Sequence, residues 1–284
     1  MTTPDTTPDP APAKSSRSKP AKARTTTKAK PKDTKPKELI GSLVHGLNII
    51  RAFDKANPEM TMTQVAEKTG MDRAGARRYL LTLADLGYVH QDGRIFRLTP
   101  KVMELGYAYL SSVPLAEKAQ YFLNRIRDRS GFPVALAIRD EDFIVHIGSA
   151  NTDEFHSPAL TIARRFRLAY SSAGRCILAH SSEEELDRTL ARIDMTPASE
   201  LSITTEAELR AELARIRSQG YALVDQEMQM GIRSLALPVF NARAEIVGSI
   251  NTYTFAGVTS IDEMMDGALP EMKLGAEELT RTLT

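Results

Sequence analysis

Residues 62–89, MTQVAEKTGMDRAGARRYLLTLADLGYV, constrain the fold of this 284-residue chain more than any other stretch, because two helical patterns are separated there by a short break. In the break, Gly70 supplies the left-handed residue that ends a first helix, and Asp72 can cap a second. Thr63 can cap the first helix. The stretch therefore predicts a short helix, a glycine turn and a longer helix.

The longer helix has an apolar side and a cationic side when about 100° is allowed for each residue. Its apolar side carries Ala76, Tyr79, Leu80, Leu83 and Leu86, and its opposite side carries Ala74, Arg77 and Arg78. The apolar side can pack against the rest of a domain, which leaves the cationic side free to contact a partner.

Helical spacing also precedes this pair of helices, and a hairpin pattern follows it. The preceding helix is predicted to end near Asn57-Pro58, and its apolar face consists of Leu43, Leu47, Ile49, Ile50 and Phe53. After Gly87, two β-prone runs flank Gln91-Asp92-Gly93, which is a strong hairpin signal. Three helices and a hairpin predict a winged helix-turn-helix over residues 39–99, whose longer helix enters the major groove of double-stranded DNA.

The predicted DNA contacts follow from this arrangement. Arg73, Arg77 and Arg78 occupy the first two turns of the longer helix, where guanidinium groups can reach guanine edges or phosphates. Ala74 lies on the same side of the helix, and Thr61, Thr63 and Arg94 are predicted to hold the DNA backbone. The alternative is a three-helix protein-interaction module with a solvated basic face.

The N-terminal stretch is strongly basic although the formal net charge of the chain is only +1. Residues 14–37 contain ten lysines and arginines against one acid, Asp33, among Pro, Ser, Thr and Ala. Because so little apolar surface is available for burial, residues 1–38 are predicted to be a disordered basic arm. Such an arm either contacts nucleic acid through counterion release or keeps the protein in solution.

The rest of the chain has an α+β pattern. Pro100 begins a predicted linker helix over residues 100–112, and a second domain is predicted over residues 113–284, opening with a helix from Leu115 to Ser130. Two strand pairs flank turns at 140–142 and 241–244, and helices are predicted at 172–180, 183–192 and 205–219. This order favours an antiparallel sheet with helices on one face.

Several classes of function are disfavoured. One cysteine, Cys176, excludes internal disulfides and thiolate-rich metal sites, and no phosphate-binding or dinucleotide motif is present, so no metal, cofactor or catalytic residue is predicted. His146 lies in a strand pattern, where a lone histidine is more often structural than catalytic. No apolar run approaches the length of a membrane helix and no secretory signal is visible, which predicts a cytoplasmic protein without membrane contact.

Two stretches could bind a small ligand. Residues 171–174, SSAG, open a predicted helix, and free N–H groups at a helix start attract a carboxylate; the alternative is an ordinary serine cap. Asn251 and Tyr253 share one face of the last predicted strand. If that face meets the serine turn, a small cavity closes between them; otherwise Tyr253 is a half-buried strand aromatic.

Four separated blocks resemble the isocitrate lyase regulator (IclR) family: the helix-turn-helix from residue 42 onward, AYSSAGRCILA, GYALVDQEMQMGIRSLALPVFN and EIVGSINTYT. The likeness covers residues 42–280. Within the family, RRYLLTL in the longer helix is most similar to regulators of aromatic-acid catabolism that respond to protocatechuate, para-hydroxybenzoate or their breakdown products.

The resemblance implies a homodimer or a dimer of dimers on palindromic promoter sites, and a GAF-like effector domain that binds a small carboxylate. The effector residues that it implies are Phe166, Ser171, Ser172, Ala173, Asp225, Ser234, Asn251 and Tyr253. The expected function is ligand-responsive transcriptional regulation. Two other functions stay open: a constitutive DNA-binding protein whose second domain only oligomerises, and an enzyme fused to a DNA-binding domain.

Overall fold

The computed structural model describes residues 39–152 and 165–283, so the predicted basic arm of residues 1–38 lies outside the described residues. Internal contacts divide the chain into two compact units. One unit ends at Leu83 and also takes in Asp92–Phe96. The other unit takes in Ala84–Gln91 and continues from Arg97.

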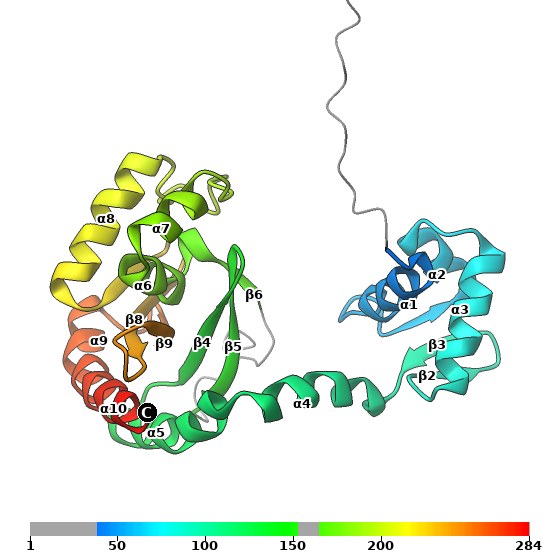
Figure 1. The fold of residues 1–284 in the computed structure, drawn as a ribbon, viewed down its shortest axis with the longest axis horizontal. Helices are drawn as coiled ribbons and strands as arrows, with labels where there is room; N and C mark the ends of the chain where they lie inside the picture. Colours follow the sequence, from blue (N-terminus) through cyan, green and yellow to red (C-terminus); the bar gives the residue numbers. More distant parts are fainter. Residues whose placement is uncertain (1–38, 153–164, 284) are drawn as a thin grey trace, which may run out of the picture. The chain divides into compact units, whose positions relative to one another are not determined.

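The first elements confirm the predicted helix-turn-helix and its hairpin (Figure 1). They are α1 (Gly41–Ala52), β1 (Glu59–Thr61), α2 (Met62–Thr69), α3 (Arg73–Asp85), β2 (Val89–Asp92) and β3 (Ile95–Leu98). The three strands form one sheet in the order β1-β3-β2. A third strand therefore joins the two of the predicted hairpin.

The caps of α2 and α3 explain the tight turn between them, and they correct one prediction. Thr61, not Thr63, caps α2: its hydroxyl accepts the N–H of Gln64, and Gln64 Oε1 accepts the N–H of Thr61 at 2.8 Å. Thr63 lies inside the helix because only Thr61 has a glutamine three residues later, as a capping box requires. Gly70 ends α2 with a φ of 68°, and Asp72 Oδ1 accepts the N–H of Gly75 at 2.6 Å, as predicted.

The predicted first helix is shorter than its pattern suggested. It ends at Ala52, because the carboxylate of Asp54 accepts the N–H groups of Ala56 and Asn57 and closes a turn. Ile49 is buried as predicted, but Leu43 and Leu47 are 63% and 46% exposed. Much of the predicted apolar face of α1 is therefore not covered by the described residues.

The second unit is built on a six-stranded sheet in the order β6-β5-β4-β9-β8-β7, and the neighbouring strands that the register describes are antiparallel. Both predicted strand pairs are present, as β4–β5 and β8–β9. A 3₁₀ turn at Pro100–Val102 precedes α4, and another at Leu168–Tyr170 precedes α6. The strands are β4 (Val134–Asp140), β5 (Phe143–Ala150), β6 (Arg165–Arg167), β7 (Ala222–Asp225), β8 (Ile232–Phe240) and β9 (Ile246–Phe255). The helices are α4 (Met103–Ser112), α5 (Pro114–Ser130), α6 (Ser172–His180), α7 (Glu183–Leu190), α8 (Glu206–Gln219), α9 (Ile261–Gly267) and α10 (Leu269–Thr282).

Helices cover both faces of this sheet, whereas the sequence pattern predicted one (Figure 1). The core under α6, α7 and α8 contains Ala236, whereas the core under α5, α9 and α10 contains its neighbours Leu235 and Leu237. All three residues of this run on β8 are buried. Strands that read as continuous apolar runs are typical of sheets covered on both sides. Among the helices of the described residues, none combines the length and apolar character that a bilayer span requires.

Candidate functional site

Helix α3 presents a row of arginines to solvent. Arg73, Arg77 and Arg78 are exposed, and none has a carboxylate partner within residues 39–152 and 165–283. On the opposite side, Ala76 and Leu80 are fully buried. The helix therefore rests on its apolar side and leaves three guanidinium groups available for phosphates and base edges.

The other four predicted DNA-contact residues differ in how far they are exposed to solvent. Ala74 and Arg94 are exposed, whereas Thr61 and Thr63 are half-buried. The hydroxyl of Thr61 already serves in the capping box of α2. DNA contact by any of these residues stays a prediction.

A small cavity of about 30 Å³ lies within the second unit. Strands β5, β6, β8 and β9 form part of its wall, together with the start of α6 and the loop between β7 and β8. Its lining residues are Ile144, His146, Phe166, Ser171, Ser172, Ala173, Met228, Ile232, Ser234, Asn251 and Tyr253. All the predicted effector residues except Asp225 are among them.

Asp225 has a different environment from the other predicted effector residues. Its Oδ1 accepts a hydrogen bond from Nε of Arg233 at 3.0 Å. Residues 225 and 233 are also paired across β7 and β8. The structure therefore gives Asp225 a partner on the neighbouring strand, and it is not among the residues that line the cavity.

The register of the sheet brings the polar lining residues together. Ser234 pairs with Tyr253 across β8 and β9, and Asn251 pairs with Ala236 on one side and Ala135 on the other. Side chains directly opposite each other in an antiparallel pair point to the same face. Ser234, Asn251 and Tyr253 therefore lie on the same face of the sheet.

The start of α6 forms the wall opposite the sheet. Ser171 is its N-cap, as the alternative interpretation held: the hydroxyl accepts the N–H of Gly174 at 3.0 Å, and the carbonyl accepts the N–H of Arg175 at 2.9 Å. The N–H groups of Ser172 and Ala173 have no hydrogen-bond partner in the described part of the chain. Two donors at the positive end of the helix dipole therefore remain for an anion.

Asn251 supplies a second polar group that could bind a ligand. The residue is only 6% exposed, and its side-chain oxygen Oδ1 has no hydrogen-bond partner within the described residues. A buried acceptor without a donor costs about 1–3 kcal/mol. A ligand with a donor group at this position would remove that cost.

Four lining residues were not predicted as ligand contacts: Ile144, His146, Met228 and Ile232. His146, which the sequence analysis interpreted as structural, has its ring centroid 5.4 Å from that of Phe166. His146 lies on β5 and Phe166 on the neighbouring strand β6, so strand pairing brings both rings to the cavity. Met228 comes from a connection without periodicity, so no sequence pattern signals its position. Within the described residues, no group of three or more His, Cys, Asp or Glu side chains could hold a metal ion.

The thiol of Cys176 is expected to be inert in the folded protein. Cys176 is fully buried on α6, and burial raises its pKa to about 12. Because an unfolded thiol ionises near pH 8.5, the unfolded state alone releases this proton above that pH, and stability falls as the pH rises. Titration with a thiol reagent at pH 8 should show no reaction in buffer and one reactive group in denaturant. Rapid reaction of the native protein would contradict the burial.

An arginine-lined helix-turn-helix and a sheet domain that encloses polar groups without partners among the described residues define the class of a ligand-responsive DNA-binding regulator. Residues 42–93 match the IclR helix-turn-helix domain, and residues 107–279 match the C-terminal domain of bacterial IclR transcriptional regulators. The chain belongs to the IclR family of transcriptional regulators. The predicted resemblance is thereby confirmed.

Curated and solved relatives agree with this assignment. The chain is 34% identical to the Pca regulon regulatory protein of Pseudomonas putida over 87% of this chain and 85% of that protein. It is 35% identical to a transcriptional regulator of Rhodococcus sp. RHA1, with a TM-score of 0.79, over 86% of this chain and 98% of that one. An IclR homologue of Microbacterium hydrocarbonoxydans, solved with 4-hydroxybenzoate, shares the fold with a TM-score of 0.72 at 16% identity, over 85% of this chain and 99% of that one.

Proposed function

We propose that this regulator controls genes of aromatic-compound catabolism and that its effector is a small aromatic carboxylate carrying a hydroxyl group. The observation that carries the proposal is the buried Asn251 oxygen, which has no donor within the described residues. The similarity to a Pca regulon regulator supports the aromatic class. So does the 4-hydroxybenzoate named for a protein of the same fold.

In the proposed binding mode, the carboxylate accepts the N–H groups of Ser172 and Ala173, and the hydroxyl donates to Asn251. The ring lies among the apolar lining side chains, of which Phe166 and Tyr253 are aromatic. A cavity of about 30 Å³ has room for roughly one water molecule. An aromatic ring therefore has to move the walls apart, and binding favours a conformation with a wider cavity.

The proposed partners are double-stranded DNA and a second copy of the chain. Helix α4 leaves Met103, Leu105 and Tyr107 at least half exposed, and the outer face of α1 exposes Leu43 and Leu47. Exposed apolar side chains that lie close together on one helix often mark a surface that contacts another protein chain. We propose that residues 100–112 act as a linker helix that transmits the effector-dependent change to the DNA-binding domains of a dimer.

The two alternative functions differ from this proposal in measurable ways. An enzyme would convert the aromatic acid, whereas a regulator binds it reversibly and leaves it unchanged. A constitutive DNA-binding protein would bind its promoter with the same affinity whether or not the acid is present. We propose that the chain carries out no reaction of its own.

Replacing Asn251 by leucine is expected to abolish the preference for a hydroxylated acid. In the wild type, isothermal titration calorimetry should show 4-hydroxybenzoate binding more tightly than benzoate, by roughly tenfold for an unmet buried hydrogen bond of about 1–3 kcal/mol. In Asn251→Leu the two affinities should become similar, since the leucine has nothing to satisfy. Thr152→Ser serves as the control, because Thr152 does not line the cavity and the variant keeps a hydroxyl group. An unchanged ratio in Asn251→Leu would remove Asn251 from the binding site.

A further inference from the structure

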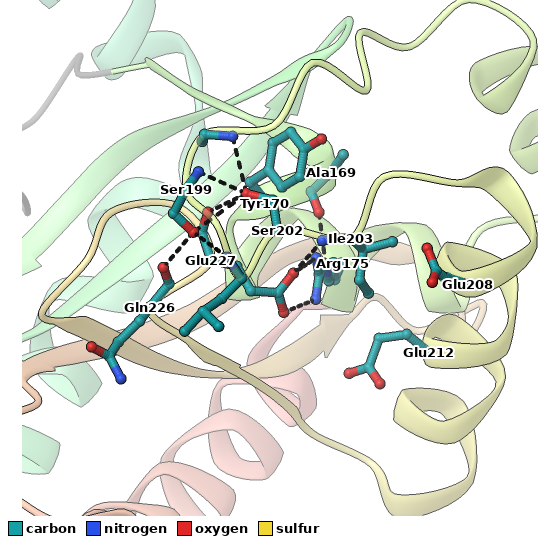
Figure 2. Close-up of polar contacts among 12 residues, drawn as sticks. Ala169, Tyr170, Arg175, Ser199, Ser202, Ile203, Glu208, Glu212, Gln226 and Glu227 are labelled. Atoms are coloured by element: carbon teal, nitrogen blue, oxygen red, sulfur yellow. Dashed lines mark hydrogen bonds and ion pairs between the residues drawn. The ribbon is translucent and has the colours of Figure 1, made fainter.

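Arg175, the fourth residue of α6, is fully buried and paired with one carboxylate (Figure 2). Its Nη1 and Nη2 donate to the two carboxylate oxygens of Glu227, at 2.6 Å and 2.5 Å. Its Nε donates to the carbonyl of Ala169 at 2.7 Å. Parallel two-point pairs of this kind are the strongest and most directional ion pairs in proteins.

Glu227 is in turn held by the segment that precedes α8 (Figure 2). Its Oε2 accepts the N–H of Ile203 at 3.0 Å, and its carbonyl accepts the hydroxyl of Ser202 at 2.7 Å. The preceding residue, Gln226, has a φ of 61°, and its carbonyl accepts the hydroxyl of Ser199 at 2.8 Å. A non-glycine residue in this conformation is strained, and it persists where its surroundings fix it.

These contacts connect two walls of the cavity without lining it. Ser172 and Ala173 lie on one wall, and only Gly174 separates them from Arg175 in α6. Met228, on the other wall, directly follows Glu227. The ion pair thus joins the start of α6, which presents the N–H groups of Ser172 and Ala173, to the loop that places Met228.

We propose that Arg175 and Glu227 are positioning residues whose buried pair sets the separation between the start of α6 and Met228, and thereby the size of acid that the cavity accepts. This inference rests on the proposed function, because it concerns the same cavity. The pair acts on ligand choice through Ser172, Ala173 and Met228 and touches no ligand itself.

A purely structural pair would have a different effect. Buried ion pairs add little net stability compared with apolar residues of the same volume, although the loss of one partner is costly. If this pair only supported the fold, its weakening would lower the melting temperature and leave the ranking of ligands unchanged. If it positions the walls, the ranking changes as well.

The test compares full-length variants by calorimetry with 4-hydroxybenzoate and its 3-methoxy derivative, together with their melting temperatures. Glu227→Gln keeps the shape of the side chain but removes its charge, and Ser202→Ala loosens the Glu227 backbone without leaving a buried charge unpaired. Arg139→Lys is the control, because Arg139 also joins a strand to a helix, through a one-point and more exposed pair with Glu185 and a hydrogen bond to Thr189 on α7, and does not line the cavity.

The wild type is expected to prefer the smaller acid, and Glu227→Gln should reduce this preference by about tenfold, within the range for coupled neighbours. Ser202→Ala should reduce it in the same direction by a smaller factor, which keeps the test valid if Glu227→Gln does not fold. Arg139→Lys should lower the melting temperature only. A wild-type ratio in every folded variant would overturn the inference, whereas failure of the wild type to bind either acid would overturn the proposed function and the inference with it.

Discussion

The double variant Arg77→Ala, Arg78→Ala is expected to bind its promoter DNA about 30-fold or more weakly than the wild type. Each good contact of an arginine with a base edge is worth about 1–3 kcal/mol, and about 1.4 kcal/mol corresponds to a factor of ten. Both side chains are exposed on α3 and have no carboxylate partner within the described residues. Arg78 also lies over the ring of Tyr79, 5.8 Å from its centroid, and an exposed contact of this kind contributes only about 0.5–1 kcal/mol, so the fold is expected to survive the double substitution.

A titration of labelled promoter DNA, repeated at several salt concentrations, distinguishes base contacts from phosphate contacts. Loss of a phosphate contact weakens binding to all sequences and lowers the salt slope by about one. Loss of a base contact weakens binding mainly at the specific site. The matched control is the double variant Arg188→Ala, Arg281→Ala, because both arginines are exposed in the second unit and their loss also removes two positive charges. Equal promoter affinity in the double variant and the control would exclude α3 as the recognition helix.

The substitution Gly174→Ala is expected to destabilise the effector domain by about 2–3 kcal/mol, at the upper end for overpacking. A Cβ at this position would lie 2.2 Å from the carbonyl oxygen of Leu168, and a backbone atom cannot turn aside as a flexible side chain can. Either α6 moves away from the preceding turn or the domain unfolds more readily. In both cases the N–H groups of Ser172 and Ala173 change place.

Urea unfolding followed by circular dichroism measures this loss, and calorimetry with 4-hydroxybenzoate measures the accompanying loss of affinity. Gly106→Ala provides the control, since a Cβ added at Gly106 on α4 has no atom within 4 Å. Alanine should stabilise that helix by about 0.5–1 kcal/mol. If Gly174→Ala unfolds at the same urea concentration as the wild type, the close approach at Gly174 does not exist.

The predicted effector residues show how far a family resemblance reaches. It named residues from three of the four blocks, together with Phe166, and all of that set except Asp225 line one cavity. Reasoning from the residues alone had reached only the serine turn and the Asn251–Tyr253 pair, because a strand pattern reports which residues share a face but not what that face meets. Whether the set binds an effector stays a prediction that calorimetry tests.

The sequence by itself determined the features whose causes lie within a few residues. The glycine turn at Gly70, the caps at Asp72 and Ser171 and the two hairpins depend on neighbours three or four positions away, so local patterns were sufficient. The choice between Thr61 and Thr63 was wrong although it too is local, because the prediction overlooked the glutamine that completes the box.

Only the tertiary structure decided features that depend on distant partners. Residue 175 meets residue 227 across 52 positions, and no periodicity in either segment announces that contact. The same holds for the helices on the second face of the sheet and for Met228 in the cavity wall. Sequence patterns record whether a side chain prefers burial, whereas packing decides which other side chain it is buried against.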